Sequence, residues 1–503
     1  MMDDMTLAAL AEGIPGRGVG SGWQAVRISG MATDSRAVLP GDLFAALPGR
    51  HTHGLAYVKS AVAAGAVAVL LPAPPPVPER WTLLGYAACD PRRALSTMAA
   101  RLYGHPGRRL RLVGVTGTNG KTTVVSMLAH LLRSSGRRAS FWSTARVVGG
   151  GHDDRPRYTT PEAPDLHAFL ADVAAHGDQD AVLEVSSHAL ALDRVADLRF
   201  AVAVVTSLSP DHLDFHGSYD AYVRAKRRLV ETLDPSATVV LNGADPTVAA
   251  FARDASAPVV RYGVRGRSEA WAEAVEPEAH GVRFRLHVRG RSPSWTRVPM
   301  PGRHNVQNAL AAVVAARALG VEPAVARRAL PALTPPVRRV QADQVGPYTI
   351  INDVAMNRAS YDAVLATVSA LGRPVVVVNA LRGNRGVDVN RDAARVLAEW
   401  ASRHAGAMVV VTSSDAHVAR LAVDYRVRDE EWAGFLDEAE RRGLIVDAHR
   451  ELAPAIGAAV RRLPAGGVLL LLGTFGMDDG PELARGLLEA RWHAEAGGRR
   501  VDR

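Results

Sequence analysis

A glycine-rich segment around Lys121 contains the residue types that bind a polyphosphate. Residues 114–123 read Gly-Val-Thr-Gly-Thr-Asn-Gly-Lys-Thr-Thr. An apolar run over 112–115 predicts a buried strand before this turn, and 124–132 has the spacing of a helix after it. The N–H groups of such a turn can enclose phosphate oxygens, a lysine can reach the terminal phosphates, and a threonine hydroxyl can hold Mg²⁺. The segment predicts a site for ATP and Mg²⁺ formed by Gly117, Thr118, Asn119, Gly120, Lys121, Thr122 and Thr123.

Lysine is rare in this chain, which makes Lys226 informative as well. Lysine and arginine together number 60, but Lys59, Lys121 and Lys226 are the only lysines. Because an ammonium is a compact point charge and a guanidinium a planar fork, we expect a retained lysine to do what arginine cannot. Lys226 stands in a helical run, 221–227. One interpretation is a basic helix face. The other is an amine that adds CO₂ to form a carbamate, which requires a site that lowers its pKa from about 10.4.

Polar side chains also follow other apolar runs. Glu184 ends an apolar strand, and in a parallel sheet the carboxyl ends of the strands face the ligand crevice. Glu184 could there join Thr122 in holding Mg²⁺. Thr159 and Thr160, after a polar loop at 149–157, could hold a carboxylate or a sugar-linked phosphate. The alternative is an ordinary helix start with Thr160 as its cap and the following proline in the first turn.

A loop rich in acid and imidazole groups leaves another predicted strand. The segment 205–217 contains Asp211, His212 and His216, and Asn242 ends a later strand in the same way. Mg²⁺ prefers oxygen ligands, so these residues alone favour a histidine ligand only weakly. The alternative for one of the two histidines is that it stabilises the loop.

The elements that must position these groups alternate between strand and helix patterns. From about 111 to 330 they predict a mostly parallel sheet covered by helices. After a break at 331–336, a second series predicts a smaller doubly wound domain, with strands at 349–351, 375–378, 408–412 and 468–472. The predicted fold class is α/β with three domains: an N-terminal domain at 1–106, a central P-loop ATPase domain at 107–332 and a C-terminal Rossmann-like domain at 333–503.

The first block has short elements. A helix at 56–64 and a strand at 66–71 are predicted, with a proline-rich loop at 71–78 and a linker at 104–109.

Composition excludes several classes of protein. The chain has 503 residues, of which 48% are apolar and 22% charged, as in soluble globular proteins. The formal charge of +9 could indicate nucleic acid, but the arginines are scattered without aromatic interleaving, and anionic substrates explain the charge equally well. A single cysteine, Cys89, excludes an internal disulfide. Without a signal-peptide pattern or an apolar run of spanning length, we expect a cytoplasmic monomer with no nucleic-acid or membrane partner.

The segment Gly-Thr-Asn-Gly-Lys-Thr-Thr at 117–123 resembles the nucleotide loop of the Mur ligases and of their relatives, the folylpolyglutamate and cyanophycin synthetases. Asp34-Ser35-Arg36, the segment 40–46 and His53-Gly54 resemble the uridine-nucleotide-binding domain of the tripeptide synthetases in this family, the MurE type. Folylpolyglutamate synthetases have no such domain. The resemblance implies ATP-driven amide-bond formation.

The resemblance also implies roles for particular residues. Lys121, Glu184, His212 and Lys226 would be catalytic, and a carbamylated Lys226 would hold Mg²⁺ together with Thr122, Glu184 and His212. The remaining ATP-binding positions would be Asn305, Asn308, Arg339 and Asp353. A UDP-linked muramoyl-peptide-like substrate would meet Ser35, Thr159, Thr160, Ser186 and Arg194.

The last block departs from the family pattern. Arg338 replaces a glycine, and Asp353 is followed by Val-Ala-Met-Asn-Arg where tripeptide synthetases have Tyr-Ala-His-Thr-Pro. The family's Gly-Gly-Asp-Arg-Asp becomes Arg-Gly-Asn-Arg-Gly at 382–386. Its Asp-Asn-Pro-Arg becomes Ser-Asp-Ala-His at 414–417, and its closing Gly-Lys-Gly-His-Glu becomes Gly-Thr-Phe-Gly-Met at 473–477. The identity of the added amino acid is therefore not readable from these motifs.

Three functional hypotheses follow. The favoured one is an ATP-dependent ligase that adds an amino acid to a UDP-muramoyl-peptide-like carboxylate through an acyl phosphate, as in peptidoglycan precursor synthesis. The second is a paralogue that joins a different acid and amine in another pathway, cyanophycin-like or secondary metabolism. The third is a nucleotide-binding partner subunit with little turnover.

Overall fold

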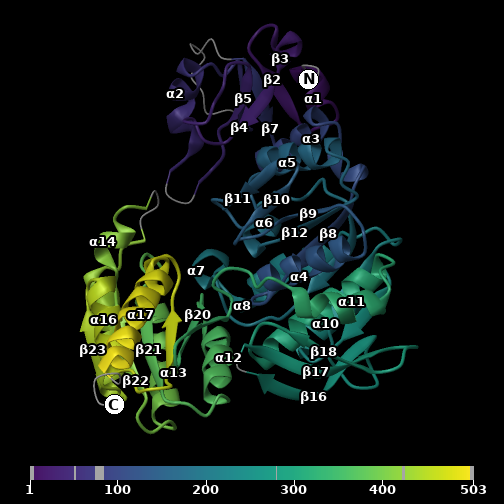
Figure 1. Ribbon diagram of the computed structural model, residues 1–503. Coiled ribbons are helices and arrows are strands. Elements are labelled where there is room, and N and C mark those ends of the chain that lie inside the picture. Colours follow the sequence, from purple (N-terminus) through teal and green to yellow (C-terminus); the bar gives the residue numbers. More distant parts are fainter. Residues whose placement is uncertain (1–4, 50–51, 74–83, 279, 422–424, 499–503) are drawn as a thin grey trace.

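The computed structural model describes residues 5–49, 52–73, 84–278, 280–421 and 425–498. Three sheets, each with its own helices, follow one another along the chain and form separate bodies in space (Figure 1). The predicted α/β class with three domains is confirmed. The domain boundaries after 106 and after 332 stay predictions. Among the helices of the described residues, none is both long and apolar enough to cross a membrane.

The first sheet has five strands in the order β2-β7-β6-β5-β4. They are β2 (Gly16–Val19), β4 (Gly30–Ala32), β5 (Asp42–Ala45), β6 (Ala68–Pro72) and β7 (Gly85–Ala88), all parallel except β2. The helices are α1 (Leu7–Ala11), α2 (Val58–Ala63) and α3 (Pro91–Leu102), and a short pair, β1 (Met5–Thr6) and β3 (Arg27–Ile28), lies beside them. The helix predicted at 56–64 is a 3-10 turn, Gly54–Tyr57, followed by α2. The predicted proline-rich loop begins where β6 ends, and its residues 74–78 lie outside the described residues.

The central sheet has eleven strands in the order β11-β10-β9-β12-β8-β13-β14-β15-β16-β17-β18. The strands from β9 to β16 in this order are parallel, and the two ends are antiparallel. Their bounds are β8 (Arg111–Thr116), β9 (Ala139–Trp142), β10 (Val147–Gly149), β11 (His152–Asp154), β12 (Asp180–Glu184), β13 (Phe200–Val205), β14 (Thr238–Asn242), β15 (Val259–Tyr262), β16 (Ala270–Glu278), β17 (Gly281–Val288) and β18 (Ser294–Val298). The predicted parallel sheet is confirmed, and β8 lies near its middle.

Helices cover both faces of this sheet. They are α4 (Lys121–Ser134), α5 (Ala163–Ala175), α6 (Ser187–Ala191), α7 (Leu213–His216), α8 (Tyr219–Glu231), α9 (Pro246–Ala250), α10 (Arg303–Ala318) and α11 (Pro323–Ala329). Val113 of β8 packs in one buried cluster with residues of α4 and α10, whereas its neighbour Leu112 packs in another with α5 and α8. Since both faces of β8 are buried, its sequence is continuously apolar instead of alternating.

Two local expectations for the central block are wrong. The segment 149–157 is not simply a polar loop, because β10 and β11 form a hairpin that extends the sheet from β9. The alternative helix start at Thr160 is also incorrect. The helix α5 begins at Ala163, after Glu162. The proline in its first turn is therefore Pro164, three residues after the proline that follows Thr160.

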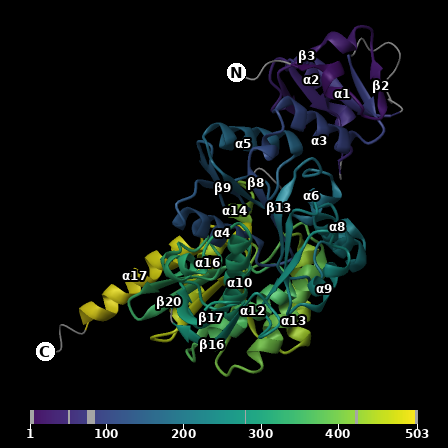
Figure 2. The same cartoon turned by 90° about the vertical axis from the view of Figure 1, so that its right-hand side faces the viewer.

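The third sheet has six strands in the order β19-β20-β24-β21-β22-β23. All are parallel except β19, and the bounds are β19 (Gln341–Val345), β20 (Tyr348–Asp353), β21 (Val375–Ala380), β22 (Met408–Thr412), β23 (Val446–His449) and β24 (Val468–Leu472). The helices are α12 (Arg358–Ser369), α13 (Val387–Ala401), α14 (Asp415–Val418), α15 (Asp429–Arg441), α16 (Leu452–Arg462) and α17 (Gly480–Gly498). The four strands predicted here are confirmed. Figure 2 shows the end of α17 projecting away from the rest of the chain.

Candidate functional site

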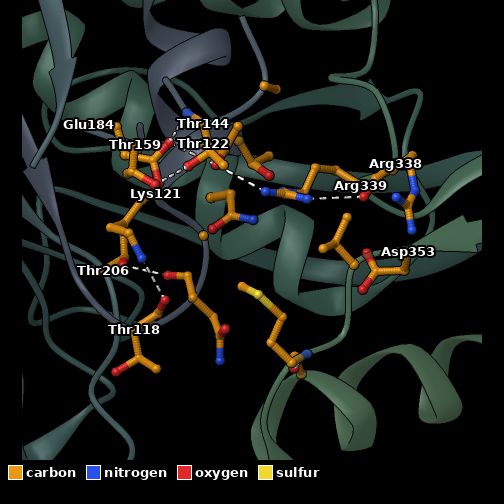
Figure 3. A pocket seen from close by; sticks show the side chains of 18 of the residues that line it. Thr118, Lys121, Thr122, Thr144, Thr159, Glu184, Thr206, Arg338, Arg339 and Asp353 are labelled. Carbon is orange, nitrogen blue, oxygen red and sulfur yellow. Dashed lines mark hydrogen bonds between the residues drawn. The ribbon is translucent and has the colours of Figure 1, made fainter. Parts of the chain in front are cut away.

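A cavity of about 1000 Å³ lies between the central and the third sheet, at the carboxyl ends of their strands. Figure 3 shows Lys121, Thr122 and Glu184 on one side of it and Arg339 and Asp353 on the other. Most of the predicted site residues line this cavity: Thr118, Asn119, Gly120, Lys121, Thr122, Thr123, Thr159, Glu184, Ser186, His212, Lys226, Asn305, Asn308, Arg339 and Asp353. The chain therefore gathers groups more than 200 residues apart at one crevice.

The glycine-rich turn connects β8 to α4 in a conformation that needs its glycines. Gly117 and Gly120 have φ values of +142° and +88°. A Cβ atom on Gly120 would lie 2.4 Å from the amide oxygen of Asn308, and one on Gly117 would lie 1.9 Å from the Thr206 hydroxyl. Glycine is therefore the residue that fits both positions. The Lys121 ammonium donates to the carbonyls of Gly117 (3.0 Å) and Thr118 (2.7 Å), and burial lowers its pKa.

Thr122 and Glu184 meet at the amino end of α4. The Thr122 hydroxyl donates to a Glu184 carboxylate oxygen at 2.8 Å, and the backbone N–H of Thr144 donates to the same oxygen at 2.8 Å. The Glu184 side chain is nearly fully buried, with 2% of the residue exposed. A hydroxyl and a carboxylate in contact at the edge of a phosphate loop supply the hard oxygen ligands that Mg²⁺ prefers.

Lys226 points into the protein from α8. It is 1% exposed, its ammonium group donates to the carbonyl of Gly117 at 2.7 Å, and it lies 4.8 Å from the centre of the Tyr222 ring. Burial, and then the nearby charge of Lys121, hold its pKa well below the ordinary value for lysine. A basic helix face exposed to solvent does not describe this residue, because Arg224 occupies the exposed position on the helix and Lys226 does not.

His212 meets an arginine of the third sheet's body. Its Nδ1 lies 2.9 Å from Nη2 of Arg385, which also lies 3.9 Å from Asp211 and 3.7 Å from Asp214. A guanidinium can only donate, so the neutral imidazole accepts at Nδ1 and carries its proton at Nε2. Burial is the main cause that lowers the pKa of His212 to about 3. Within the described residues, no three His, Cys, Asp or Glu side chains form a group that could hold a metal ion by themselves.

The two asparagines predicted to bind ATP are hydrogen-bonded to one another. Asn308 donates to the Asn305 side chain at 3.1 Å, and Asn305 donates to the carbonyl of Pro301 at 2.7 Å. The amide oxygen of Asn308 is the atom that a side chain at Gly120 would strike. Asn308 thus packs against the phosphate loop from the α10 side, and Tyr262 and His304 continue the lining there.

The third body closes the cavity with Arg339 and Asp353. Arg339 donates to the Thr122 hydroxyl at 3.3 Å, and the Asp353 carboxylate accepts from the N–H of Val340 at 2.9 Å. Burial raises the pKa of Asp353 to about 6, although Arg339 and Arg338 oppose the shift. Arg338 adopts a φ of +57°, which explains why a glycine suits this position in the tripeptide synthetases that the chain resembles.

The family can be assigned from comparison with known proteins. The model of the Mur ligase middle domain matches residues 115–316, and that of the Mur ligase family catalytic domain matches residues 27–103. The chain is 34% identical over 492 residues to the UDP-N-acetylmuramoyl-L-alanyl-D-glutamate–2,6-diaminopimelate ligase of Streptomyces coelicolor, a match that covers 95% of this chain and 93% of that protein. The chain belongs to the Mur ligase family. The expected resemblance to the MurE type is confirmed by a second relative, the UDP-N-acetylmuramyl-tripeptide synthetase of Roseiflexus, with 35% identity and 89% of each chain covered.

Solved structures agree with this Mur ligase in fold. MurF from Acinetobacter baumannii aligns over 97% of this chain and 99% of its own with a TM-score of 0.70 and 22% identity. MurF from Thermotoga maritima, solved with ADP, aligns over 92% and 98% with a TM-score of 0.65 and 18% identity. At these identities the likeness concerns the fold. This Mur ligase is an ATP-dependent, ADP-forming enzyme, so a partner subunit without turnover is not its class.

The residues predicted to meet the acid substrate divide into two groups. Thr159 and Ser186 line the cavity. Thr160 is buried in the Mur ligase framework: its hydroxyl donates to the carbonyl of Glu184 at 2.7 Å and accepts from the N–H of Ser186 at 3.0 Å. Arg194 donates to the carbonyl of Thr160 at 2.9 Å and to Glu162 at 2.5 Å. These two residues hold the turn that carries Thr159.

Ser35 is the predicted site residue that lies apart from the others. It belongs to the first body and does not line the cavity. The neighbouring Asp34 lies 3.6 Å from Arg157, which follows the β10–β11 hairpin. The hairpin, whose Asp153 and Asp154 line the cavity, is therefore followed by a residue that contacts the first body.

Asn357 is a residue whose role the sequence did not indicate. It caps α12, and its side-chain amide donates to Asp211 at 3.2 Å and exchanges hydrogen bonds of 3.0 and 3.3 Å with Asn119 of the phosphate loop. A second such contact joins Arg155 to Asp478 at 3.2 Å. Both bridges connect residues far apart in sequence, and only the motif departure at 353–358 signalled that this turn differs from the family pattern.

Proposed function

We propose that this Mur ligase adds an amino acid to the carboxylate of a UDP-N-acetylmuramoyl dipeptide, as its relatives from Streptomyces coelicolor and Chlorobaculum tepidum are named to do. The ligase chemistry and its place in peptidoglycan precursor synthesis follow from the family. The observation that carries the site assignment is the contact of Thr122 with Glu184 beside Lys121, opposite Arg339. This is a cluster of charged and polar groups suited to a reacting phosphate.

The reaction is a transfer in two steps. A carboxylate oxygen of the acid attacks the γ-phosphorus of ATP and ADP leaves, which forms an acyl phosphate. The amine then attacks the acyl carbon and inorganic phosphate leaves. The first step brings two anions together, so it needs positive charge placed in advance around the transferred group. Lys121 donates to carbonyls of the phosphate loop and Arg339 donates to Thr122 at the start of α4, so both place positive charge there.

The residues present suit Mg²⁺ as a cofactor. Thr122 and Glu184 would hold one ion, since both offer oxygen and touch one another. His212 and a carbamate on Lys226 would hold a second. The buried Lys226 amine beside the Gly117 carbonyl, with its pKa held well below the ordinary value for lysine by burial, supports the carbamate, because only an unprotonated amine adds CO₂. When bound, Mg²⁺ would neutralise phosphate charge. His212 becomes a ligand only if Arg385 moves from its Nδ1.

Contacts across the cavity support a closed reaction chamber. Arg339 reaches Thr122, and Asn357 reaches both Asn119 and Asp211. A closed third body would exclude water, which would otherwise hydrolyse the acyl phosphate. We also propose domain boundaries at 106/107 and 332/333, and contacts with the acid substrate at Ser35, Thr159 and Ser186.

A screen of amino acids against UDP-muramoyl dipeptide, with phosphate release and product mass as readouts, tests this function. We expect release that depends on both the dipeptide and one class of amino acid, and a product heavier by one residue. Phosphate release with neither dependence would contradict the proposal.

A second candidate keeps the ligase chemistry but joins a different acid and a different amine. The departures at Arg338 and Arg382 favour it, because both line the cavity where the substrates meet. Protection by uridine nucleotides in a thermal-shift assay separates the two: a rise in Tm with UDP-N-acetylmuramic acid supports the muramoyl substrate, and no rise supports another acid.

A further inference from the structure

The wall of the cavity that belongs to the third body is where the amine must approach. The phosphate loop fills the floor, and Thr159 and Ser186 lie on the side of the acid substrate. On the side of the third body, the lining includes residues that follow β20, β21 and β24, among them Met356, Arg382, Phe475 and Asp478. An amine that attacks the acyl carbon from opposite the acid is therefore in contact with this wall.

Most charged groups on this wall already have protein partners. Asp478 binds Arg338 and Arg155, and Arg338 also donates to the carbonyl of Thr474 at 2.9 Å. Arg339 donates to Thr122. Each of these side chains is therefore already held by protein atoms: Arg338 and Arg155 share Asp478, and Arg339 is directed at the phosphate loop.

Arg382 is the exception. Its backbone is fixed by Asn390, but its guanidinium forms no hydrogen bond or ion pair with any residue of the described parts of the chain. Burial, and then the nearby Arg385, lower the pKa of Arg382 to about 10, against the pull of Asp211 and Asp214. The side chain therefore remains charged at neutral pH. A desolvated cation without a partner is costly, and an anion that enters the cavity would remove that cost.

The backbone holds Arg382 in place next to an aromatic pair. A Cβ atom on Gly383 would lie 2.2 Å from the carbonyl oxygens of Tyr425 and Arg426, so the loop packs directly against that segment. The Tyr425 ring stacks on Phe475, with centroids 4.1 Å apart and planes 17° apart. Phe475 and Met356 line the same cavity as Arg382. The wall thus offers one free positive charge and an apolar surface.

We propose that Arg382 binds the carboxylate of the incoming amino acid and that Phe475 and Met356 contact its side chain, which makes this enzyme specific for amino acids with a neutral, apolar side chain. The inference rests on the proposed ligase function. A second carboxylate, as in diaminopimelate, finds no second free cation on this wall, and His417, at the position of a family arginine, is paired with Asp479 at 2.8 Å instead. A cationic side chain on the amino acid would be repelled by the positive charge of Arg382.

The test compares substrates and one variant in the full-length protein with ATP and Mg²⁺. Leucine, valine and phenylalanine are compared with diaminopimelate, lysine and glutamate, and each apolar amino acid with the amine that lacks its carboxylate. We expect kcat/KM for the best apolar amino acid to exceed that for diaminopimelate at least about tenfold, and the loss of the carboxylate to cost roughly tenfold to a hundredfold, as for one hydrogen-bonded charge.

Arg382→Gln should raise the KM for the amino acid by the same roughly tenfold to hundredfold factor and remove the preference over the decarboxylated amine, while the KM for ATP changes less than about twofold. Arg485→Gln is the matched control, since that arginine is exposed on α17 and pairs with Asp343 at 3.2 Å. If Arg382→Gln instead raises the KM for ATP, the anion at Arg382 is a phosphate and the proposal is wrong. A preference for diaminopimelate would overturn it as well.

Direct binding separates this inference from the proposed function. Saturation-transfer NMR of leucine with the ADP-bound protein needs no turnover and no muramoyl substrate. Binding that Arg382→Gln removes and Arg485→Gln keeps would retain the amino-acid site even if UDP-muramoyl dipeptide fails as the acid. Equal signals from both variants would reject the site even if the dipeptide is ligated.

Discussion

On the floor of the cavity, Lys121 donates to a carbonyl of the glycine-rich turn and Thr122 donates to Glu184, and Gly117 and Gly120 in this turn have no room for a side chain. On the opposite wall, Arg338 and Arg382 stand where the tripeptide synthetases that this chain resembles have glycine, and Phe475 lies within their charged closing motif. The floor handles a triphosphate, which is the same in every Mur ligase. The wall contacts the amine in the proposal above, so its residues can change while the phosphate chemistry stays the same.

The largest expected effect tests the floor. Lys121→Ala should lower kcat at least about a thousandfold. The substitution removes the positive charge that the lysine places at the terminal phosphates, while the backbone turn remains. Lys59→Ala is the matched control, since Lys59 is exposed on α2. Phosphate release and a thermal melt of each variant measure the effect. A normally active Lys121→Ala enzyme would mean that the phosphate site has been placed wrongly.

The next effect concerns Lys226. Lys226→Ala should lose about a hundredfold or more in activity and recover part of it with a short carboxylic acid in excess, since a carbamate acts as an anionic oxygen group. Lys226→Arg should not recover, because the guanidinium would fill the buried space beside Tyr222 with the wrong charge. Full activity of Lys226→Arg, measured in the same assay, would rule out the carbamate.

The sequence predicts the floor better than the wall for a physical reason. The turn at Lys121 and the strand that ends at Glu184 are local patterns, and parallel strands deliver their carboxyl ends to one edge. The contacts of Asn357 with Asn119 and of Arg385 with His212 join residues 238 and 173 positions apart. No local pattern encodes them. The framework role of Thr160 escaped as well, because its partners Glu184 and Ser186 come from another element.

A third prediction concerns stability and uses the raised pKa of Asp353, about 6. The folded protein keeps this carboxyl protonated between its unfolded pKa of about 3.9 and 6, so the unfolded state binds fewer protons in that range. Stability should therefore fall as pH rises from about 4 to 6. Asp353→Asn should remove this slope and gain about 3 kcal/mol at pH 7, while weakening ATP binding. Urea unfolding at pH 4.5 and pH 7 measures it, and an unchanged slope in Asp353→Asn would contradict the assignment.

The smallest effect tests the link between floor and wall. Asn357→Ser can still cap α12 but is too short to reach Asn119 and Asp211. We expect kcat/KM to fall about tenfold with a Tm within a few degrees, since roughly one net hydrogen bond to a charged group is lost. Asn357→Ala, which also removes the cap, should lower the Tm further. If Asn357→Ser is as active as the natural protein, the bridge does not contribute to closure.

The claim that this cavity makes an acyl phosphate can be measured directly with isotope. The reacting carboxylate of UDP-muramoyl dipeptide is labelled with ¹⁸O, and the enzyme is given ATP, Mg²⁺ and its best amino acid. Because the carboxylate oxygen that attacks phosphorus stays with it, we expect one ¹⁸O atom in each phosphate released. Amide formation that releases unlabelled phosphate would contradict it.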